Sequence, residues 1–188
     1  MDGSALAYVR ALADAGVVLQ RQPRGIWTVE RPYTVTDGKA SLTIHPATAP
    51  GLRLSYLLDY GPGSVLGRQR HTHEISPTGL HNGLADCRTF LLENEAQMMA
   101  RNGFGRGITE RDLLIFGPRG PVGNELRYDD EPARHKALDL VGDLPLVGVD
   151  LAGHAIGCRS GHALNVQLAR QLREGLATPS FRPLRLAA

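Results

Sequence analysis

The sequence contains few cysteines and lacks long apolar runs, and both features limit the classes of protein to which it can belong. Among 188 residues only Cys87 and Cys158 are cysteines, and they form no Cys-x-x-Cys pair. The sequence therefore predicts neither a disulfide framework nor a zinc ribbon, and it fits a reducing, cytoplasmic setting. No run of about 18 apolar residues occurs and the start lacks a signal-peptide pattern, so we expect neither a membrane-spanning segment nor export.

An excess of charge of one sign is also lacking. Lys and Arg total 21 against 19 for Asp and Glu, which gives a formal charge of +2, and the arginines are scattered along the chain. A gathered basic surface is the electrostatic footprint of nucleic-acid binding, so nucleic acid is not an expected partner. The length and the 42% hydrophobic composition instead predict globular material with one well-buried core.

The pattern of apolar residues predicts an α+β fold, with a mixed β-sheet and several helices packed on one face. Helices are expected at 4–16, 93–101, 130–144 and 161–174, with Ser4 and Ser160 as caps of the first and last. Strands are expected in a meander at 26–44 and at 52–60, 87–92, 113–116, 125–128 and 155–158. Residues 61–86 are expected to be mostly a polar connection, and the tail after Ala177 to be loosely ordered.

One predicted helix carries polar residues at a regular spacing. His135, Asp139 and Asp143 recur every four positions, so they project from nearly one stripe. Imidazole nitrogen and carboxylate oxygen are ordinary zinc donors, and a pair one helical turn apart can ligate one ion. Asp143 could then orient a further imidazole. The pattern alone favours another interpretation, a solvated polar stripe on an amphipathic helix, and leaves a salt-bridged face open as a third.

The remaining histidines give weaker signals. His162 falls in the first turn of the last predicted helix, where a carboxylate such as Asp143 would suit it to proton transfer. The alternative is that His162 only hydrogen-bonds a neighbour. His71 and His73 are expected in a polar loop and His81 in a turn, without a third partner at ligand spacing, so they predict no metal site.

Several strings resemble, in order and spacing, the zinc-dependent UDP-3-O-acyl-N-acetylglucosamine deacetylase family of lipid A biosynthesis. They lie at 1–4, 87–90, 124–131, 134–144 and 160–165, and so span nearly the whole chain. The resemblance implies two similar domains that hold their helices between two sheets, with zinc between the domains. This chain resembles the second domain at 21–177, preceded by a connecting helix at 1–20 and followed by a tail at 178–188. Half of such a sandwich should expose an apolar helix face.

The resemblance also implies roles for individual residues. His135 and Asp139 match two zinc ligands. Thr89 matches a hydroxyl that assists the developing oxyanion, and His162 matches an imidazole that acts as an acid or electrostatic stabiliser. Asp143 matches the carboxylate partner of that imidazole.

Substrate-binding positions follow from the same resemblance. Lys136 and Arg159 match basic positions for the nucleotide phosphates, although Arg159 replaces the commoner lysine and so changes the hydrogen-bond geometry. Tyr60 matches an aromatic position for the uracil, and Phe90 is expected to bind substrate as well. The helix at 93–101, with Met99, either lines a passage for the acyl chain or is plain core.

Two functions are compatible with these residues. The first is zinc-dependent hydrolysis of the acetamide of UDP-3-O-acyl-N-acetylglucosamine, giving acetate and the free amine. The family's third zinc-ligand histidine and its glutamate base belong to the first domain, so this function needs that domain from an upstream region or a separate chain. The alternative is a non-catalytic module that binds a sugar nucleotide or a protein partner and keeps Lys136, Arg159 and Tyr60 without the metal.

Overall fold

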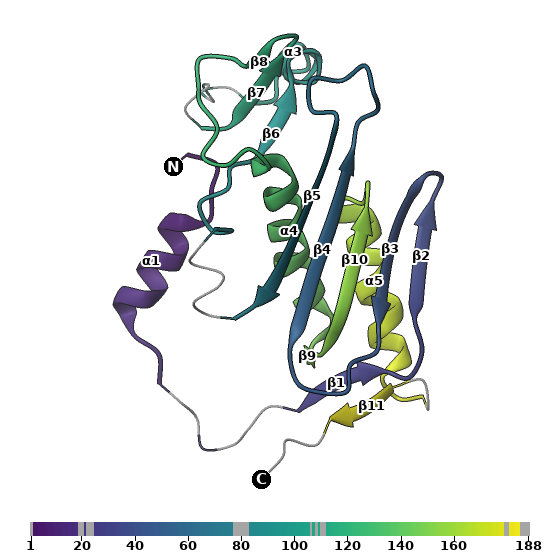
Figure 1. The fold of residues 1–188 in the computed structure, drawn as a ribbon. Helices are drawn as coiled ribbons and strands as arrows, with labels where there is room; N and C mark the ends of the chain where they lie inside the picture. Colours follow the sequence, from purple (N-terminus) through teal and green to yellow (C-terminus); the bar gives the residue numbers. More distant parts are fainter. Residues whose placement is uncertain are drawn as a thin grey trace.

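The computed structural model describes residues 2–18, 21, 25–76, 83–105, 107, 109, 112–178 and 181–184. Its largest element is a five-stranded sheet in the order β2-β3-β10-β4-β5 (Figure 1). The strands are β2 (Tyr33–Asp37), β3 (Ala40–His45), β10 (Gly153–Cys158), β4 (Leu52–Asp59) and β5 (Arg68–Ile75). Because β10 is antiparallel to β3 and parallel to β4, the sheet is mixed, as predicted.

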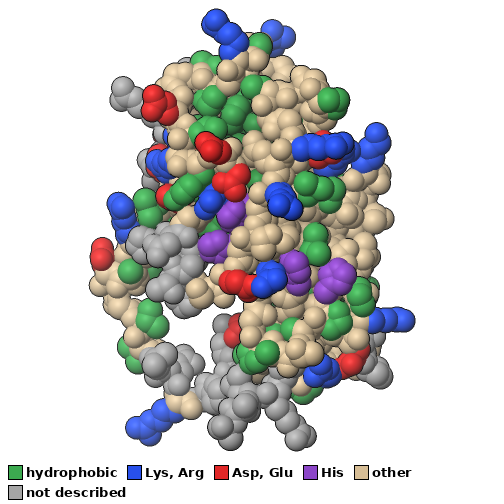
Figure 2. All heavy atoms as spheres, viewed as in Figure 1, with side chains coloured by type: hydrophobic (Ala, Val, Ile, Leu, Met, Phe, Trp, Pro, Cys, Tyr) green, Lys and Arg blue, Asp and Glu red, His purple; other side chains and the backbone are tan. Residues whose placement is uncertain are grey.

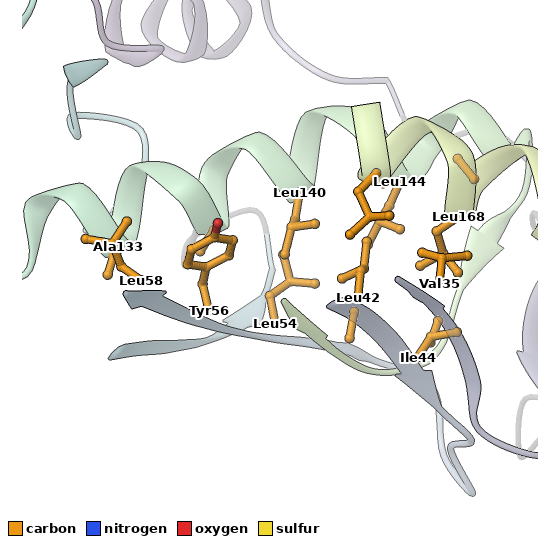
Figure 3. Packing of buried hydrophobic residues seen from close by; sticks show 14 of the residues in the cluster. Val35, Leu42, Ile44, Leu54, Tyr56, Leu58, Ala133, Leu140, Leu144 and Leu168 are labelled. Atoms are coloured by element: carbon orange, nitrogen blue, oxygen red, sulfur yellow. The ribbon is translucent and has the colours of Figure 1, made fainter. Parts of the chain in front are cut away.

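Two helices cover one face of this sheet. Helix α4 (Glu131–Asp143) packs on β4 and β5, and α5 (His162–Gly175) packs on β2 and β3 (Figure 1). Alternate residues of the strands point into the layer between, where Leu42 and Leu54 meet Leu140 and Leu168 (Figure 3). Burying one such leucine contributes about 1.5–3 kcal/mol, so this layer fixes the helices on the sheet. The predicted α+β class, with helices on one face, is confirmed.

Smaller elements lie at the two ends of the main sheet (Figure 1). A second sheet joins β1 (Ile26–Val29) to β9 (Asp150–Leu151) and β11 (Phe181–Leu184). A third joins β6 (Phe90–Leu92), β7 (Leu114–Gly117) and β8 (Gly120–Pro121), with α3 (Glu93–Arg101) directly after β6 and a 3₁₀ turn, η1 (Leu144–Val147), after α4. No helix among the described residues is long and apolar enough to cross a membrane.

Helix α1 (Leu6–Ala15) stands apart from this core and has no buried residue. Its Tyr8 and Leu12 side chains are 60% and 69% exposed. Large apolar groups on a helix are stabilising only when another surface removes them from water. The apolar helix face that the resemblance predicts belongs to the domain at 21–177 and stays a prediction, while α1, which precedes that domain, exposes an apolar side of its own.

The polar connection predicted at 61–86 is wrong in part, because it contains β5. This strand lies at the edge of the sheet and alternates polar residues on both faces, so it has no apolar run to reveal it. Its inward side chains instead contact the start of α4. Gln69 accepts a hydrogen bond from the Ala133 amide at 3.3 Å, and His71 pairs with Asp130 at 3.0 Å. His81 lies outside the described residues.

Three predicted strand assignments also differ from the structure. The meander is limited to the β2–β3 hairpin, because β1 pairs with β9 and β11 instead. The strand predicted at 87–92 begins only at Phe90. Residues 125–128 form no strand, because the Glu125 carbonyl and the Arg127 amide bind the buried Arg88–Glu131 pair described below.

Both predicted serine caps and part of the predicted tail also differ. Ala5 and Gly161 occupy the cap positions of α1 and α5, and neither helix has a side-chain cap hydrogen bond. Ser160 turns its hydroxyl into the interior instead, where it is 3% exposed. Within the tail, Phe181–Leu184 form β11, because pairing with β1 satisfies their backbone groups.

Candidate metal and nucleotide site

Helix α4 places His135 and Asp139 one turn apart, with side chains only 12% and 11% exposed. His135 Nδ1 lies 3.2 Å from the carbonyl oxygen of Cys87, which accepts its hydrogen bond and so fixes the tautomer. The other ring nitrogen, Nε2, is left facing Asp139 Oδ1 at 3.4 Å. Burial lowers the pKa of His135, which favours the neutral imidazole that a metal requires.

The spacing of these two groups fits a zinc ion. Two ligands that each lie about 2.0–2.1 Å from a tetrahedral ion are roughly 3.3 Å apart. The distance between His135 Nε2 and Asp139 Oδ1 is 3.4 Å. Among the described residues, no group of three or more His, Cys, Asp or Glu side chains is arranged to hold a metal ion.

At the start of α5, the His162 imidazole lies close to two carboxylates, those of Asp143 and Asp139. His162 Nδ1 lies 2.8 Å from Asp143 Oδ2, and Asn165 donates to that oxygen at 2.9 Å. His162 Nε2 is 3.8 Å from Asp139 Oδ1, and the ring is 67% exposed. A ring held by one carboxylate, beside a candidate metal position and open to solvent, is able to donate a proton to a bound molecule.

Lys136 connects this pair to a neighbouring hollow of about 320 Å³. Its Nζ donates to Asp139 Oδ2 at 2.6 Å. The hollow is lined by Tyr56, Leu58, Asp59, Tyr60, Lys136, Arg159, Ser160 and Gly161. Phe90 lies beside it, with its ring centroid 6.2 Å from that of Tyr60 and 6.3 Å from that of His135. The structure thus brings together all four residues that were predicted to bind substrate.

Arg159 lines this hollow, and two features position it: a left-handed backbone conformation and an ion pair with an acidic residue. Its φ of 54° lies in the left-handed region, and its guanidinium donates to Asp59 Oδ2 at 2.6 Å. Hydrogen bonding from Arg159 keeps the pKa of Asp59 below its usual range, and the Gly61 amide adds to this. No sequence pattern pointed to Asp59, because the acidic partner of a loop arginine is set by the turn and not by spacing.

The floor of the hollow depends on close backbone packing. A Cβ on Gly157 would lie 2.9 Å from both Ser160 Oγ and the Tyr56 ring, so only glycine lets these groups approach. The Tyr56 hydroxyl donates to the Ser160 carbonyl. The Ser160 hydroxyl is buried and has no hydrogen-bond partner among the described residues. With the N-terminal end of α5 adjacent, this corner is suited to an anionic ligand.

A buried ion pair fixes the segment that carries the Cys87 carbonyl. Arg88 and Glu131 are 5% and 0% exposed, and Arg88 Nε donates to Glu131 Oε1 at 2.9 Å. Arg88 also bonds the Asn124 side chain, and Glu131 accepts the amides of Arg88 and Arg127. Sequence reasoning assigned these residues no role, because a glutamate in a first helical turn is usually exposed.

Thr89 and Met99 occupy positions that the sequence did not foresee. Thr89 is exposed, and its hydroxyl and amide both donate to the Gly3 carbonyl, at 3.3 Å and 3.0 Å, so the N-terminal segment holds this residue. Helix α3 has no buried residue, and Met99 is 40% exposed. The interpretation of this helix as plain core is therefore wrong, and an apolar side of α3 remains open.

Comparisons with known proteins show the family of this chain. The family model for LpxC, described as UDP-3-O-acyl N-acetylglycosamine deacetylase, matches residues 1–174. Curated proteins named UDP-3-O-acyl-N-acetylglucosamine deacetylase are similar over nearly the whole chain. The protein from Solibacter usitatus is 38% identical over 92% of this chain and 57% of its own length. Those from Oleidesulfovibrio alaskensis and Chlamydia caviae are 35% and 33% identical over 93% of this chain, and over 56% and 62% of their own lengths. The chain thus spans less than two thirds of these relatives.

Proposed function

Because the chain belongs to the UDP-3-O-acyl N-acetylglycosamine deacetylase family, we propose that it forms the second-domain half of a zinc-dependent deacetylase. The reaction would hydrolyse the acetamide of UDP-3-O-acyl-N-acetylglucosamine, an early step of lipid A biosynthesis. The observation that carries the proposal is the 3.4 Å spacing of His135 Nε2 and Asp139 Oδ1 beside a hollow lined by Lys136 and Arg159.

Several residues of this chain would have separate roles in the reaction. His135 and Asp139 would hold zinc, which would supply a Lewis acid for the amide carbonyl and activate water as the nucleophile. His162, oriented by Asp143, would carry the proton that the departing amine needs. Thr89 would assist the oxyanion only after its hydroxyl leaves the Gly3 carbonyl.

The nucleotide would occupy the hollow next to the metal pair. Lys136 and Arg159 would bind the phosphates, with the N-terminal end of α5 completing an electropositive corner. The Tyr60 ring, which is 42% exposed and packs against the buried Phe90 ring, offers a flat apolar surface for the uracil. Since Lys136 also bonds Asp139, phosphate binding and metal ligation would be connected through one side chain.

A first domain would complete the site with a third ligand and a general base. The exposed apolar side of α1 supports this part of the proposal, because α1 precedes the core and lacks a packing partner within the described residues. That domain would come from an upstream reading frame or from a separate chain. Sequencing the DNA before Met1 for an in-frame segment that encodes a histidine next to a glutamate distinguishes the two sources.

Reconstitution tests the proposal. We expect this chain, mixed with zinc and the first domain of the Solibacter usitatus relative, to release acetate from the substrate. Neither part alone should do so, because each holds an incomplete ligand set. Acetate release is measured with and without a chelator. The same mixture with Asp139→Ala serves as the control, and acetate release that survives this change would contradict the proposed metal pair.

Nucleotide binding is expected from the isolated chain as well. Arg159→Ala should weaken UDP binding about tenfold, because a charge-assisted contact to phosphate contributes roughly 1.5–3 kcal/mol before losses to solvent. Calorimetric titration with UDP measures the effect, and Arg182→Ala, a partly exposed arginine beyond the hollow, is the matched control. Unchanged affinity in Arg159→Ala would place the nucleotide elsewhere.

The alternative function, a non-catalytic sugar-nucleotide or partner module, makes different predictions. It requires UDP binding that survives His135→Ala and Asp139→Ala, together with no acetate release from any reconstituted mixture.

A further inference from the structure

A second histidine cluster lies on β5, away from the site described above. His71 and His73 are two residues apart on one strand, so both point to the same face of the sheet, toward α4. Their rings are stacked, with centroids 5.6 Å apart and planes at 30°. From the sequence alone these residues were assigned to a loop, where no such convergence follows.

In the buried His71 ring, one nitrogen has a hydrogen-bond partner and the other has none among the described residues. The His71 side chain is 9% exposed, and its Nδ1 lies 3.0 Å from Asp130 Oδ2. Its Nε2 is buried and has no hydrogen-bond partner in the part of the chain that the structure describes. A carboxylate on one ring nitrogen and nothing on the other is the arrangement that orients a metal-ligating histidine.

We propose that His71 and His73 form a second site for a divalent transition cation such as Zn²⁺, separate from His135 and Asp139. Two imidazoles on one tetrahedral ion place their ring centroids roughly 5 Å apart, given Zn–N bonds of about 2.0–2.1 Å. The observed 5.6 Å is close to this separation, and the stacked rings would rotate to turn one nitrogen of each toward the ion. Water would complete the coordination, so the affinity would be lower than that of a structural zinc site.

The charges around the cluster fit this role. Burial lowers the pKa of His71 and so favours its neutral, ligating form. Asp130 is partly buried, but Arg134 and His71 outweigh that burial and keep its pKa below the usual range. The Asp130 carboxylate therefore stays ionised and offsets the Arg134 charge, which it contacts at 2.6 Å.

The cluster lies on an edge strand of the main sheet. β5 is the last strand of the five-stranded sheet, and no further strand among the described residues pairs with its outer edge. Figure 2 shows the face of this sheet opposite α4 and α5, where histidine side chains also lie next to acidic and basic ones. The cluster is thus at the margin of the fold and not within the main core.

Zinc titration of the full chain in a His135→Ala, Asp139→Ala background tests the proposal. We expect one Zn²⁺ per chain to remain, with affinity reduced at least tenfold by His71→Gln. Asp130→Asn should weaken binding by about 10–100-fold, as removal of a group that orients a ligand does. Thr72→Ala is the matched control, because Thr72 lies between the two histidines but faces the opposite side and bonds Ser55.

The outcomes separate the possibilities. If His71→Gln does not fold, as judged by circular dichroism, His73→Gln at the half-buried position replaces it. Absence of saturable zinc binding in the background chain overturns the proposal. So does binding that is insensitive to both glutamine variants, or that is lost only in His154→Ala, a histidine on the outer face of the same sheet bonded to Ser55.

Discussion

Replacing His135 with alanine should lower kcat/KM of the reconstituted deacetylase by about 10³-fold or more. The substitution removes one of the two ligands that this chain offers, together with its hydrogen bond to the Cys87 carbonyl. Metal stabilisation of an amide transition state contributes several kcal/mol, and each 1.36 kcal/mol corresponds to a tenfold change in rate. Acetate release and bound zinc should fall together, and both are measured on the same preparation.

The matched control for this variant is His154→Ala. His154 is a half-buried histidine on β10 and lies on the outer face of the sheet, where its Nε2 bonds the Ser55 hydroxyl at 2.8 Å. Its loss should leave kcat/KM within about twofold. Equal losses in the two variants would mean that His135 acts through general stability, and the metal assignment would then be withdrawn.

Replacing Glu131 with alanine should cost about 3–5 kcal/mol of unfolding free energy. The change leaves the Arg88 guanidinium buried without its partner, and it leaves the amides of Arg88 and Arg127 without an acceptor. Because whole domains are stable by only about 5–15 kcal/mol, much of the chain should unfold at lower denaturant concentration. Urea unfolding followed by circular dichroism measures the loss.

A surface pair provides the comparison. Arg182 Nε and Glu30 Oε1 are 3.0 Å apart, but their side chains are 44% and 43% exposed. Glu30→Ala should therefore cost no more than about 1 kcal/mol, because exposed ion pairs are screened by solvent. If the two glutamate variants lose the same stability, burial is not what makes the Arg88 pair important.

The same carboxylate should make stability depend on pH in the acid range. Burial opposes the charged form of Glu131, but Arg88 and two amides outweigh it and keep the pKa below the usual 4.5. A lowered folded-state pKa contributes stability that is complete above the unfolded pKa and is lost as pH falls through the folded one. Unfolding free energy should therefore decline below about pH 4.5, and less steeply in Glu131→Gln.

The helices were the most predictable part of the fold. Helices near 93–101, 130–144 and 161–174 are all present, because apolar spacing and terminal glycines or acidic residues are local signals. Edge strand β5 was missed because its inward residues Gln69, His71 and His73 are polar, and Gln69 and His71 find hydrogen-bond partners at the start of α4. Pairing of β1 with β9 and β11 was also missed, because it joins segments far apart in the sequence.

For the site too, local patterns could be predicted from the sequence and contacts between elements could not. The stripe of His135, Asp139 and Asp143 could be found from spacing along one helix, and resemblance to a family added Thr89 and His162. What neither showed was the environment: the Cys87 carbonyl on His135, the Asp59 carboxylate on Arg159 and the hidden Arg88–Glu131 pair. Each of these contacts joins different elements, so no local pattern records it.

The sequence by itself determined the fold class and the family, and it gave the candidate zinc ligands, because these depend on composition, periodicity and order along the chain. Only the tertiary structure decided which nitrogen of His135 faces Asp139, and which residues line the hollow beside Lys136. It also changed His71 and His73 from loop residues into a stacked pair on one strand face. The physical reason is that distance, burial and tautomer are set by packing between elements, which one-dimensional spacing does not contain.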